Sequence, residues 1–320
     1  MTLDESNVSM TRNDVVAAAA RIAPYAHRTP VLTSRSINEI VGAELYFKAE
    51  NLQRVGAFKF RGACNAVFSL TDAQASHGVI THSSGNHAAA LALAAKLRGI
   101  EALIVMPENA PDIKKAAVAG YGAKIEFCAA NEAAREAAVA HAQTLHPFEL
   151  IHPFNDCRII SGQGTAALEL LTDEPELDAI MTPVGGGGLL SGTALAASES
   201  SVKVLGTEPA NADDAARSFA ADKVIPITAP DTIADGLRTS LGDLTFAIIR
   251  SQVEQIMTVS EDAIVHAMKL LWERMNIIVE PSAAVPLAAL MEQGMPDGIA
   301  KAGIILSGGN VDLGHLPWQD

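Results

Sequence analysis

The chain has few cysteines, few aromatic residues and a shortage of positive charge, and each shortage excludes a class of protein. Its three cysteines, Cys64, Cys128 and Cys157, lie far apart without a CxxC pair, so no disulfide framework is expected. The 23 lysines and arginines are outnumbered by 37 acidic residues, which argues against a nucleic-acid partner. We therefore expect reduced thiols in a cytoplasmic protein that acts on a small molecule.

The chain also lacks a convincing membrane segment. Residues 1–10 are polar and acidic, without the basic and apolar regions of a signal peptide. The longest uncharged run, residues 179–198, is long enough to span a bilayer, but it contains Pro183 and five glycines. A buried strand, loop and helix explains this run better, so no membrane partner is expected.

Short aliphatic runs alternate with alanine-rich amphipathic stretches, a pattern that predicts an α/β protein with a parallel sheet covered by helices. No linker marks a domain boundary, so a second domain would be inserted within the first. We expect strands at 44–48, 78–81, 102–106, 124–127, 179–184, 203–207 and 303–306. We expect helices at 12–20, 86–98, 110–119, 132–145, 162–171, 189–197 and 261–275.

Three loops of small residues follow predicted strands: residues 83–87 (SSGNH), 185–188 (GGGG) and 307–310 (SGGN). Because ligands bind beyond the carboxyl ends of parallel strands, these loops suggest one composite site. Four consecutive glycines exceed the need of a tight turn, and their N–H groups before a helix favour a phosphate. The serines and amide of the first loop suit a carboxylate, although an ordinary helix cap needs only one serine.

Lys59 stands between Phe58 and Phe60. Poor solvation there would disfavour the ammonium form and lower the pKa of the lysine. A neutral amine is a nucleophile that can form a Schiff base with an aldehyde. The alternative is a structural lysine whose stem lies along apolar surface with its charge in water. The segment alone leaves both interpretations open.

Two further patterns have alternatives. Gly186, Gly188 and Ser191 approximate the GxGxxG motif, and Glu208 lies about 20 residues on, as in a nicotinamide-dependent oxidoreductase. That interpretation leaves the lysine and the serine loop without roles. The acidic segment 208–214 could hold a divalent cation or be ordinary solvated surface.

In this order, the motifs AFKFRGA at 57–63, SSGNH, GGGG, EP at 208–209 and SGGN resemble the fold-type II pyridoxal-phosphate (PLP) enzymes. The similarity covers nearly the whole chain and is specific to the group of serine racemase, threonine dehydratase and 3-hydroxyaspartate dehydratase. It implies an α/β fold like that of tryptophan synthase β, with two open twisted sheets covered by helices. It also implies a large PLP-binding domain, residues 1–75 and 153–320, and a small substrate-closing domain, residues 76–152.

The resemblance implies a role for each motif. Lys59 would form the Schiff base with PLP, Phe58 would stack near the pyridine ring, and Ser307 would meet the pyridine nitrogen. Asn86 would bond the 3-hydroxyl of PLP, and Ser84 would act on the face opposite the lysine. The phosphate would lie against four glycines, Gly185, Gly186, Gly187 and Gly188. The substrate carboxylate would lie in the serine loop, against Ser83, Ser84, Asn86 and His87.

The resemblance further implies a divalent metal, Mg²⁺ or alternatively Ca²⁺ or Mn²⁺, held by Glu208, the carbonyl of Ala212 and Asp214. Ala89 and Asn276 replace residues that serve nucleotide binding in animal serine racemase, so activation by ATP is not expected. A homodimer is expected from the family.

The implied reaction uses PLP as an electron sink, with the freed lysine removing the Cα proton before a β-hydroxyl leaves as water. The enamine so formed becomes an imine and hydrolyses to a 2-oxo acid and ammonia. Arg135 matches an arginine that can reach a second substrate carboxylate, although it could be a solvated helix charge, and Arg158 is a weaker candidate. We therefore expect a 3-hydroxyaspartate dehydratase. The alternatives are a serine or threonine dehydratase, a serine racemase and, from other classes, an NAD-dependent oxidoreductase or a non-catalytic binding protein.

Overall fold

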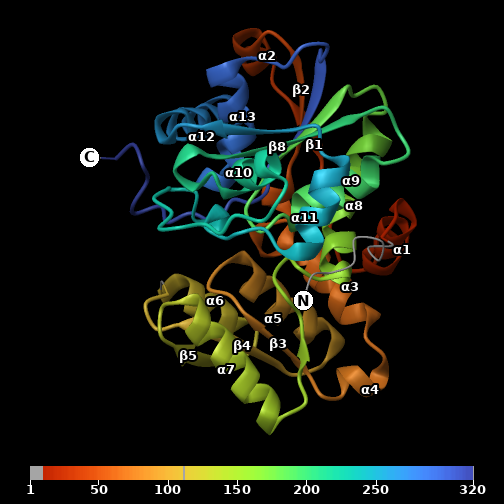
Figure 1. The fold of residues 1–320 in the computed structure, drawn as a ribbon, viewed down its shortest axis with the longest axis vertical. Helices are drawn as coiled ribbons and strands as arrows, with labels where there is room; N and C mark the ends of the chain where they lie inside the picture. The colour runs from red at the N-terminus through yellow and green to blue at the C-terminus, as the bar shows by residue number, and fades with distance from the viewer. Residues whose placement is uncertain (1–9, 111, 320) are drawn as a thin grey trace.

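The computed structural model describes residues 10–110 and 112–319, which form two mainly parallel β-sheets (Figure 1). In the larger sheet only the edge strand β1 runs antiparallel to its neighbour. Its strands, in spatial order, are β1 (Val31–Thr33), β2 (Glu44–Lys48), β10 (Lys301–Ile305), β7 (Ala179–Pro183), β8 (Lys203–Pro209) and β9 (Gln255–Val259). The smaller, fully parallel sheet has the order β5 (Lys124–Cys128), β4 (Ala102–Pro107), β3 (Val79–His82) and β6 (Glu149–Leu150).

Helices connect these strands. The α-helices are α1 (Arg12–Ile22), α2 (Arg35–Val41), α3 (Lys59–Ser69), α4 (Asp72–Ala75), α5 (Asn86–Arg98), α6 (Asp112–Gly120), α7 (Glu132–Leu145), α8 (Cys157–Asp173), α9 (Gly188–Ala197), α10 (Asp214–Ala221), α11 (Asp243–Gln252), α12 (Glu261–Met275) and α13 (Pro281–Gln293). The short 3₁₀ helices are η2 (Glu50–Leu52), η3 (Arg54–Gly56), η4 (Ala210–Ala212) and η5 (Asp235–Leu237).

Both sheets are covered by helices on both faces, because successive strand residues point to opposite sides. In β7, Met181 joins the apolar cluster that contains α12 and α13, whereas its neighbour Ile180 joins the cluster formed with α8 and α9. In β4, Ile104 packs with α5 and Val105 packs with α7. This double burial explains the near-continuous aliphatic runs of the strands, and it confirms the expected α/β fold.

All the strands and helices expected from the sequence are present, with ends that differ by up to five residues. The longest helices that the sequence did not predict are α13, with 13 residues, and α3, with 11, and the largest shift is the start of α8, five residues before the expected position. Glycines within α3 and α8 weaken the helical signal. They are needed because the helices cross closely: a Cβ added to Gly162 would lie 2.6 Å from the Cα of Gly62.

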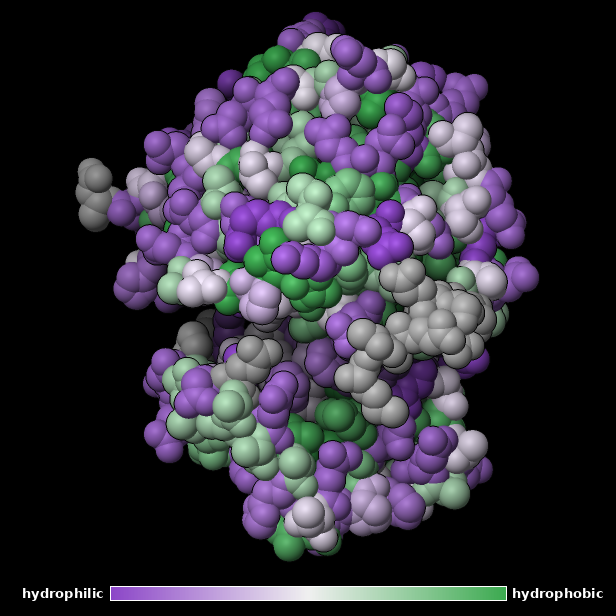
Figure 2. Space-filling view, viewed as in Figure 1, coloured by the Kyte–Doolittle hydropathy of each residue, from purple (hydrophilic) through white to green (hydrophobic). Residues whose placement is uncertain are grey.

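The two sheets lie in separate bodies, the larger above the smaller in Figure 1, and the surface is hollowed between them beside α6 (Figure 2). Every strand of the smaller sheet lies between Val79 and Leu150 in the sequence. The domain boundaries expected after residues 75 and 152 stay a prediction. Among the described residues, none of the helices combines the length and the apolar character needed to cross a membrane.

Candidate active site

Lys59 is the first residue of α3 and lies close to the end of β10. The backbone N–H of Phe58 donates to the carbonyl of Ser307 at 3.0 Å, and Ala57 forms an isolated bridge with Gly308. The Nζ of Lys59 lies 3.2 Å from the carbonyl oxygen of Pro153 and 5.2 Å from the centre of the Phe58 ring. The segment after β2 and the segment after β10 are therefore joined, which places Lys59 and Ser307 at the same sheet edge.

Burial is the main influence on the Lys59 amine. Desolvation lowers its pKa from 10.5 to about 8, and the negative charge of Glu280 opposes this decrease. Burial, and after it the positive charge of Lys59, lowers the pKa of the neighbouring His87 imidazole. Burial also lowers the pKa of His152 to about 4. Near neutral pH the site therefore holds neutral imidazoles and an amine that gives up its proton more readily than an exposed lysine.

The tetraglycine segment joins β7 to the start of α9, on the other side of the chain segment that contacts Lys59. A Cβ on Gly186 would lie 2.3 Å from the ring of Phe154, which is next to Pro153. Gly187 caps α9 with a left-handed φ of 86°, and no side chain caps this end of the helix. The backbone N–H groups of the first turn are therefore open to an anion.

The serine loop follows β3 and leads into α5. The Oγ of Ser83 accepts a hydrogen bond from the Gly85 N–H at 3.2 Å, and Asn86 is the first helical residue. His87 is buried; its Nδ1 has no partner among the described residues, and its Nε2 lies 3.4 Å from the Ile151 carbonyl oxygen. No side chain caps this helix either, so the loop leaves donors available to a carboxylate.

Two residues that the sequence did not single out contact these motifs, Pro153 and Glu280, and so does Asn310, the last residue of the predicted SGGN loop. The Nδ2 of Asn86 donates to both carboxylate oxygens of Glu280, at 3.0 and 3.1 Å. The Nδ2 of Asn310 donates to the Oδ1 of Asn86 at 2.9 Å. The only local signal at Glu280 is its place before a proline at the start of a helix, which marks a helix boundary and gives no hint of a site.

A buried acidic pair lies at the end of β8. The Glu208 carboxylate accepts from the backbone N–H groups of Ala216 and Ala215, at 2.6 and 3.3 Å. Burial, with a contribution from Asp214, raises the pKa of Glu208 to about 8, and burial raises the pKa of Asp214 to about 7. The Oδ2 of Asp214 is buried without a partner among the described residues. No group of three or more His, Cys, Asp or Glu side chains suited to a metal occurs in the described part of the chain.

The two arginines proposed for a second substrate carboxylate differ in their contacts. Arg158 is engaged: it pairs with Asp156 at 2.6 Å and with Glu149 at 2.7 Å. Arg135, on α7, has a buried Nε without a hydrogen-bond partner among the described residues. The guanidinium of Arg158 is therefore largely occupied, whereas Arg135 has a buried donor left for a ligand.

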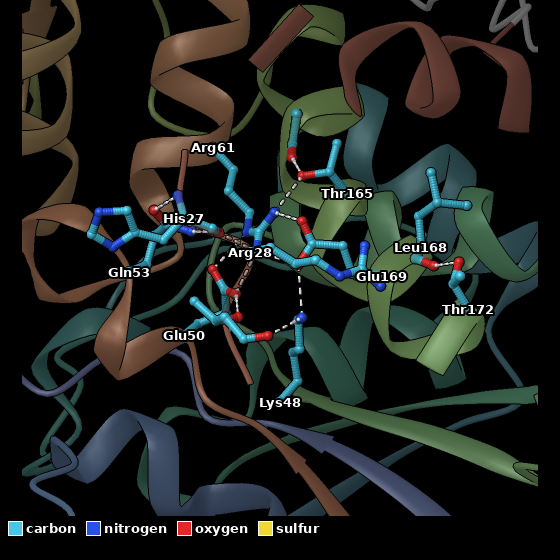
Figure 3. A network of polar contacts seen from close by, with 12 residues as sticks. His27, Arg28, Lys48, Glu50, Gln53, Arg61, Thr165, Leu168, Glu169 and Thr172 are labelled. Atoms are coloured by element: carbon cyan, nitrogen blue, oxygen red, sulfur yellow. Dashed lines mark hydrogen bonds and ion pairs between the residues drawn. The ribbon is translucent and has the colours of Figure 1, made fainter. Parts of the chain in front are cut away.

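A buried network of charges anchors the helix that begins with Lys59 (Figure 3). Arg61, fully buried, donates to Glu50 at 2.7 and 2.8 Å and to Glu169 at 2.8 and 2.9 Å. Lys48 pairs with Glu169 at 2.7 Å. Two cations thus balance two carboxylates, and they tie α3 to β2, η2 and α8.

Comparisons with known proteins agree with this geometry. The family described as pyridoxal-phosphate dependent enzyme matches residues 22–308. The chain is 50% identical over 318 residues to serine racemase of Dictyostelium discoideum, with 98% of each chain covered. It is 49% identical over 313 residues to beta-hydroxyaspartate dehydratase of Paracoccus denitrificans, covering 97% of this chain and 99% of the relative. The structure of maize serine racemase matches with a TM-score of 0.94 and 50% identity, over 96% of this chain and 95% of that chain. The chain therefore belongs to the family of pyridoxal-phosphate-dependent enzymes.

Proposed function

We propose that this enzyme is a dehydratase of a β-hydroxy amino acid, with 3-hydroxyaspartate as its main substrate. The reaction would release water and then ammonia to leave a 2-oxo acid. The proposal is supported by the lowered pKa of the Lys59 amine together with the buried Nε of Arg135, which has no hydrogen-bond partner among the described residues. Membership of the PLP family leaves the oxidoreductase interpretation without support. A serine or threonine dehydratase and a serine racemase remain the alternatives.

The residues present fit PLP. Lys59 would bind its aldehyde, Phe58 would lie against the ring, Asn86 would donate to the ring oxygen, and Ser307 would meet the ring nitrogen. The open N–H groups before α9 would hold the phosphate, at Gly185, Gly186, Gly187 and Gly188. When bound, PLP withdraws electrons from the substrate Cα and so acidifies its proton.

The chain's own groups would then move the proton and hold the substrate. Lys59 Nζ, with its pKa near 8, would accept the Cα proton as a general base at neutral to mildly alkaline pH. The substrate carboxylate would bind the loop of Ser83, Ser84, Asn86 and His87. A hydroxyl of Ser84 on the opposite face would allow a proton to return there, which gives a racemase side activity.

Replacing Arg135 by alanine should alter substrate preference rather than abolish activity. We expect kcat/KM for 3-hydroxyaspartate to fall by about 10- to 100-fold, the value of a lost hydrogen bond between charged groups. The value for serine should stay within about threefold, because serine has no second carboxylate. The measurement compares hydroxyaspartate stereoisomers, serine and threonine in wild type, Arg135→Ala and the exposed-surface control Arg35→Ala. A preference for threonine that Arg135→Ala leaves intact would contradict the dicarboxylate proposal.

We also propose a divalent cation, Mg²⁺ or alternatively Ca²⁺ or Mn²⁺, at Glu208, the Ala212 carbonyl and Asp214. It is supported by two buried carboxyls with raised pKa values and by the unpartnered Oδ2 of Asp214. Buried acids that lack a cation favour their neutral form, whereas a bound cation would hold them ionised.

Adding Mg²⁺ to chelator-treated enzyme should raise its thermal midpoint, because a ligand of the native state stabilises it by about 2.7 kcal/mol at 100 times its Kd. Differential scanning fluorimetry with Mg²⁺, Ca²⁺ and Mn²⁺ measures this shift. The shift should vanish in Asp214→Asn and persist in Asp72→Asn, whose carboxylate is exposed. An equal shift in both variants would place the cation elsewhere.

Three expectations from the sequence stay predictions: a homodimer, a cytoplasmic location and a small domain over residues 76–152. Light scattering of the purified protein tests the first of these.

A further inference from the structure

Glu280 is a carboxylate at the cofactor site for which the proposed function has no role. It is 5% exposed and precedes α13. Its backbone N–H donates to the carbonyl of Gly308 at 2.9 Å, and a Cβ on Gly308 would lie 2.6 Å from its Oε1. The strand end that carries Ser307 thus packs directly on the carboxylate, which leaves Glu280 little freedom to move.

The hydrogen bonds of Glu280 determine the orientation of the Asn86 amide. Its two oxygens share the Nδ2 of Asn86, and its Oε2 also accepts from the Asn310 N–H at 3.2 Å. On the other side of the amide, the Nδ2 of Asn310 donates to the Oδ1 of Asn86. A flipped Asn86 would set acceptor against acceptor and donor against donor. Since an amide nitrogen carries two hydrogens, the observed orientation leaves one N–H of Asn86 for a ligand.

Glu280 also acts on Lys59 through its charge. Its negative charge favours the ammonium form of Lys59, against the effect of burial. Burial raises the pKa of Glu280 itself to about 7, which Asp235 increases and Lys114 decreases. Lys114, on α6, and Asp235, in η5, form an ion pair at 2.5 Å. Glu280 therefore lies in a charge cluster with Lys59, Asp235 and Lys114.

We propose that Glu280 is a positioning residue: it turns an N–H of Asn86 toward the ring oxygen of PLP, and its charge sets the pH at which Lys59 can bond the cofactor. The inference rests on the proposed roles of Lys59 and Asn86. It adds that Glu280 influences how readily the chain binds PLP, an effect that can be measured separately from the catalytic rate.

The test removes PLP from the full-length chain and adds it back at a series of pH values. The visible absorption band of the Schiff base between PLP and Lys59 gives the rate at which the cofactor is captured. Glu280→Gln keeps the shape but removes the charge. The pH midpoint of the capture rate should move about one unit toward acid, since a nearby opposite charge typically contributes one unit or more. Its amide also keeps only one acceptor oxygen and sets an NH2 group beside the Nδ2 of Asn86 in place of the other, so the Kd for PLP should rise about five- to tenfold, the value of one hydrogen bond.

Three further variants separate charge from orientation. Glu280→Asp keeps the charge on a shorter stem, so the midpoint should stay near that of wild type while the Kd rises. Asn310→Ala should raise the Kd without moving the midpoint, which keeps the test decisive if a Glu280 variant folds poorly. Glu261→Gln alters another helix-start carboxylate, half-buried at the beginning of α12, and should change neither quantity.

An unshifted pH midpoint in Glu280→Gln, or an equal shift in Glu280→Asp, would overturn this inference and leave the proposed role of Lys59 standing. A coloured band that still forms in Lys59→Ala would instead contradict the proposed role of Lys59, and the inference with it.

Discussion

Replacing Lys59 by alanine is expected to yield a colourless protein without measurable turnover. In its proposed roles Lys59 bonds the cofactor and accepts the Cα proton, and alanine can do neither, so both the visible absorption band and catalysis should be lost with this one side chain. We expect kcat to fall by at least about 10³-fold, the typical contribution of a positioned general base. Absorption spectra of the purified protein and a 2-oxo acid assay measure the two effects.

The matched control is Lys115→Ala. Lys115 also lies near a phenylalanine ring, 5.5 Å from the centre of Phe127, but on α6 outside the proposed cofactor site. Its loss should leave the colour unchanged and kcat/KM within about twofold, as is usual for a solvent-accessible side chain. If Lys59→Ala stays coloured and active, or Lys115→Ala loses its colour, the cofactor lysine has been assigned wrongly.

Replacing Arg61 by methionine is expected to cause the largest loss of stability of any single change considered. Methionine fills a similar volume but removes the guanidinium that pairs with Glu50 and Glu169. Glu169 keeps Lys48 as a partner, whereas Glu50 loses its only cation partner among the described residues, and both carboxylates are largely buried. Breaking a buried ion pair from one side typically costs about 3–5 kcal/mol. Chemical denaturation of the holoenzyme should show this as a lower midpoint.

The control is the exposed pair of Arg35 and Glu39, four residues apart on α2. Arg35→Ala should cost less than about 0.5 kcal/mol, because such surface pairs contribute little. A loss below about 1 kcal/mol in Arg61→Met would show that the network does not hold the helix. Because Lys59 lies only two residues before Arg61, we also expect the methionine variant to retain PLP less tightly.

Much of the candidate site could be predicted because its signals are local. Four glycines before a helix, two serines after a strand and a lysine between two phenylalanines each express their chemistry within a few residues. The structure places Lys59, Ser307 and the glycine loop at one sheet edge, as expected from parallel pairing. Helix α3 was missed for a physical reason as well, since Gly62 is selected by the close approach of α8 and lowers helix propensity.

The partners of these residues could not be predicted, since they come from distant parts of the chain. Glu280 is 194 residues from Asn86, and Asn310 is 224 residues from it. A contact between segments so far apart leaves no periodicity or spacing in a single sequence. The same holds for Arg61 and Glu169, which meet only because α3 packs on α8.

By itself, the sequence determined the α/β class, most strands and helices and the residue types of the proposed cofactor lysine and of the proposed phosphate loop. These properties follow from the period of the hydrophobic residues and from the positions of glycines and hydroxyl side chains, and each of these signals depends only on residues close together in the sequence. Only the tertiary structure decided which charges surround that lysine, which arginine is engaged and which way the Asn86 amide points. Those depend on burial and on electrostatic fields, and both arise only when distant segments exclude water together.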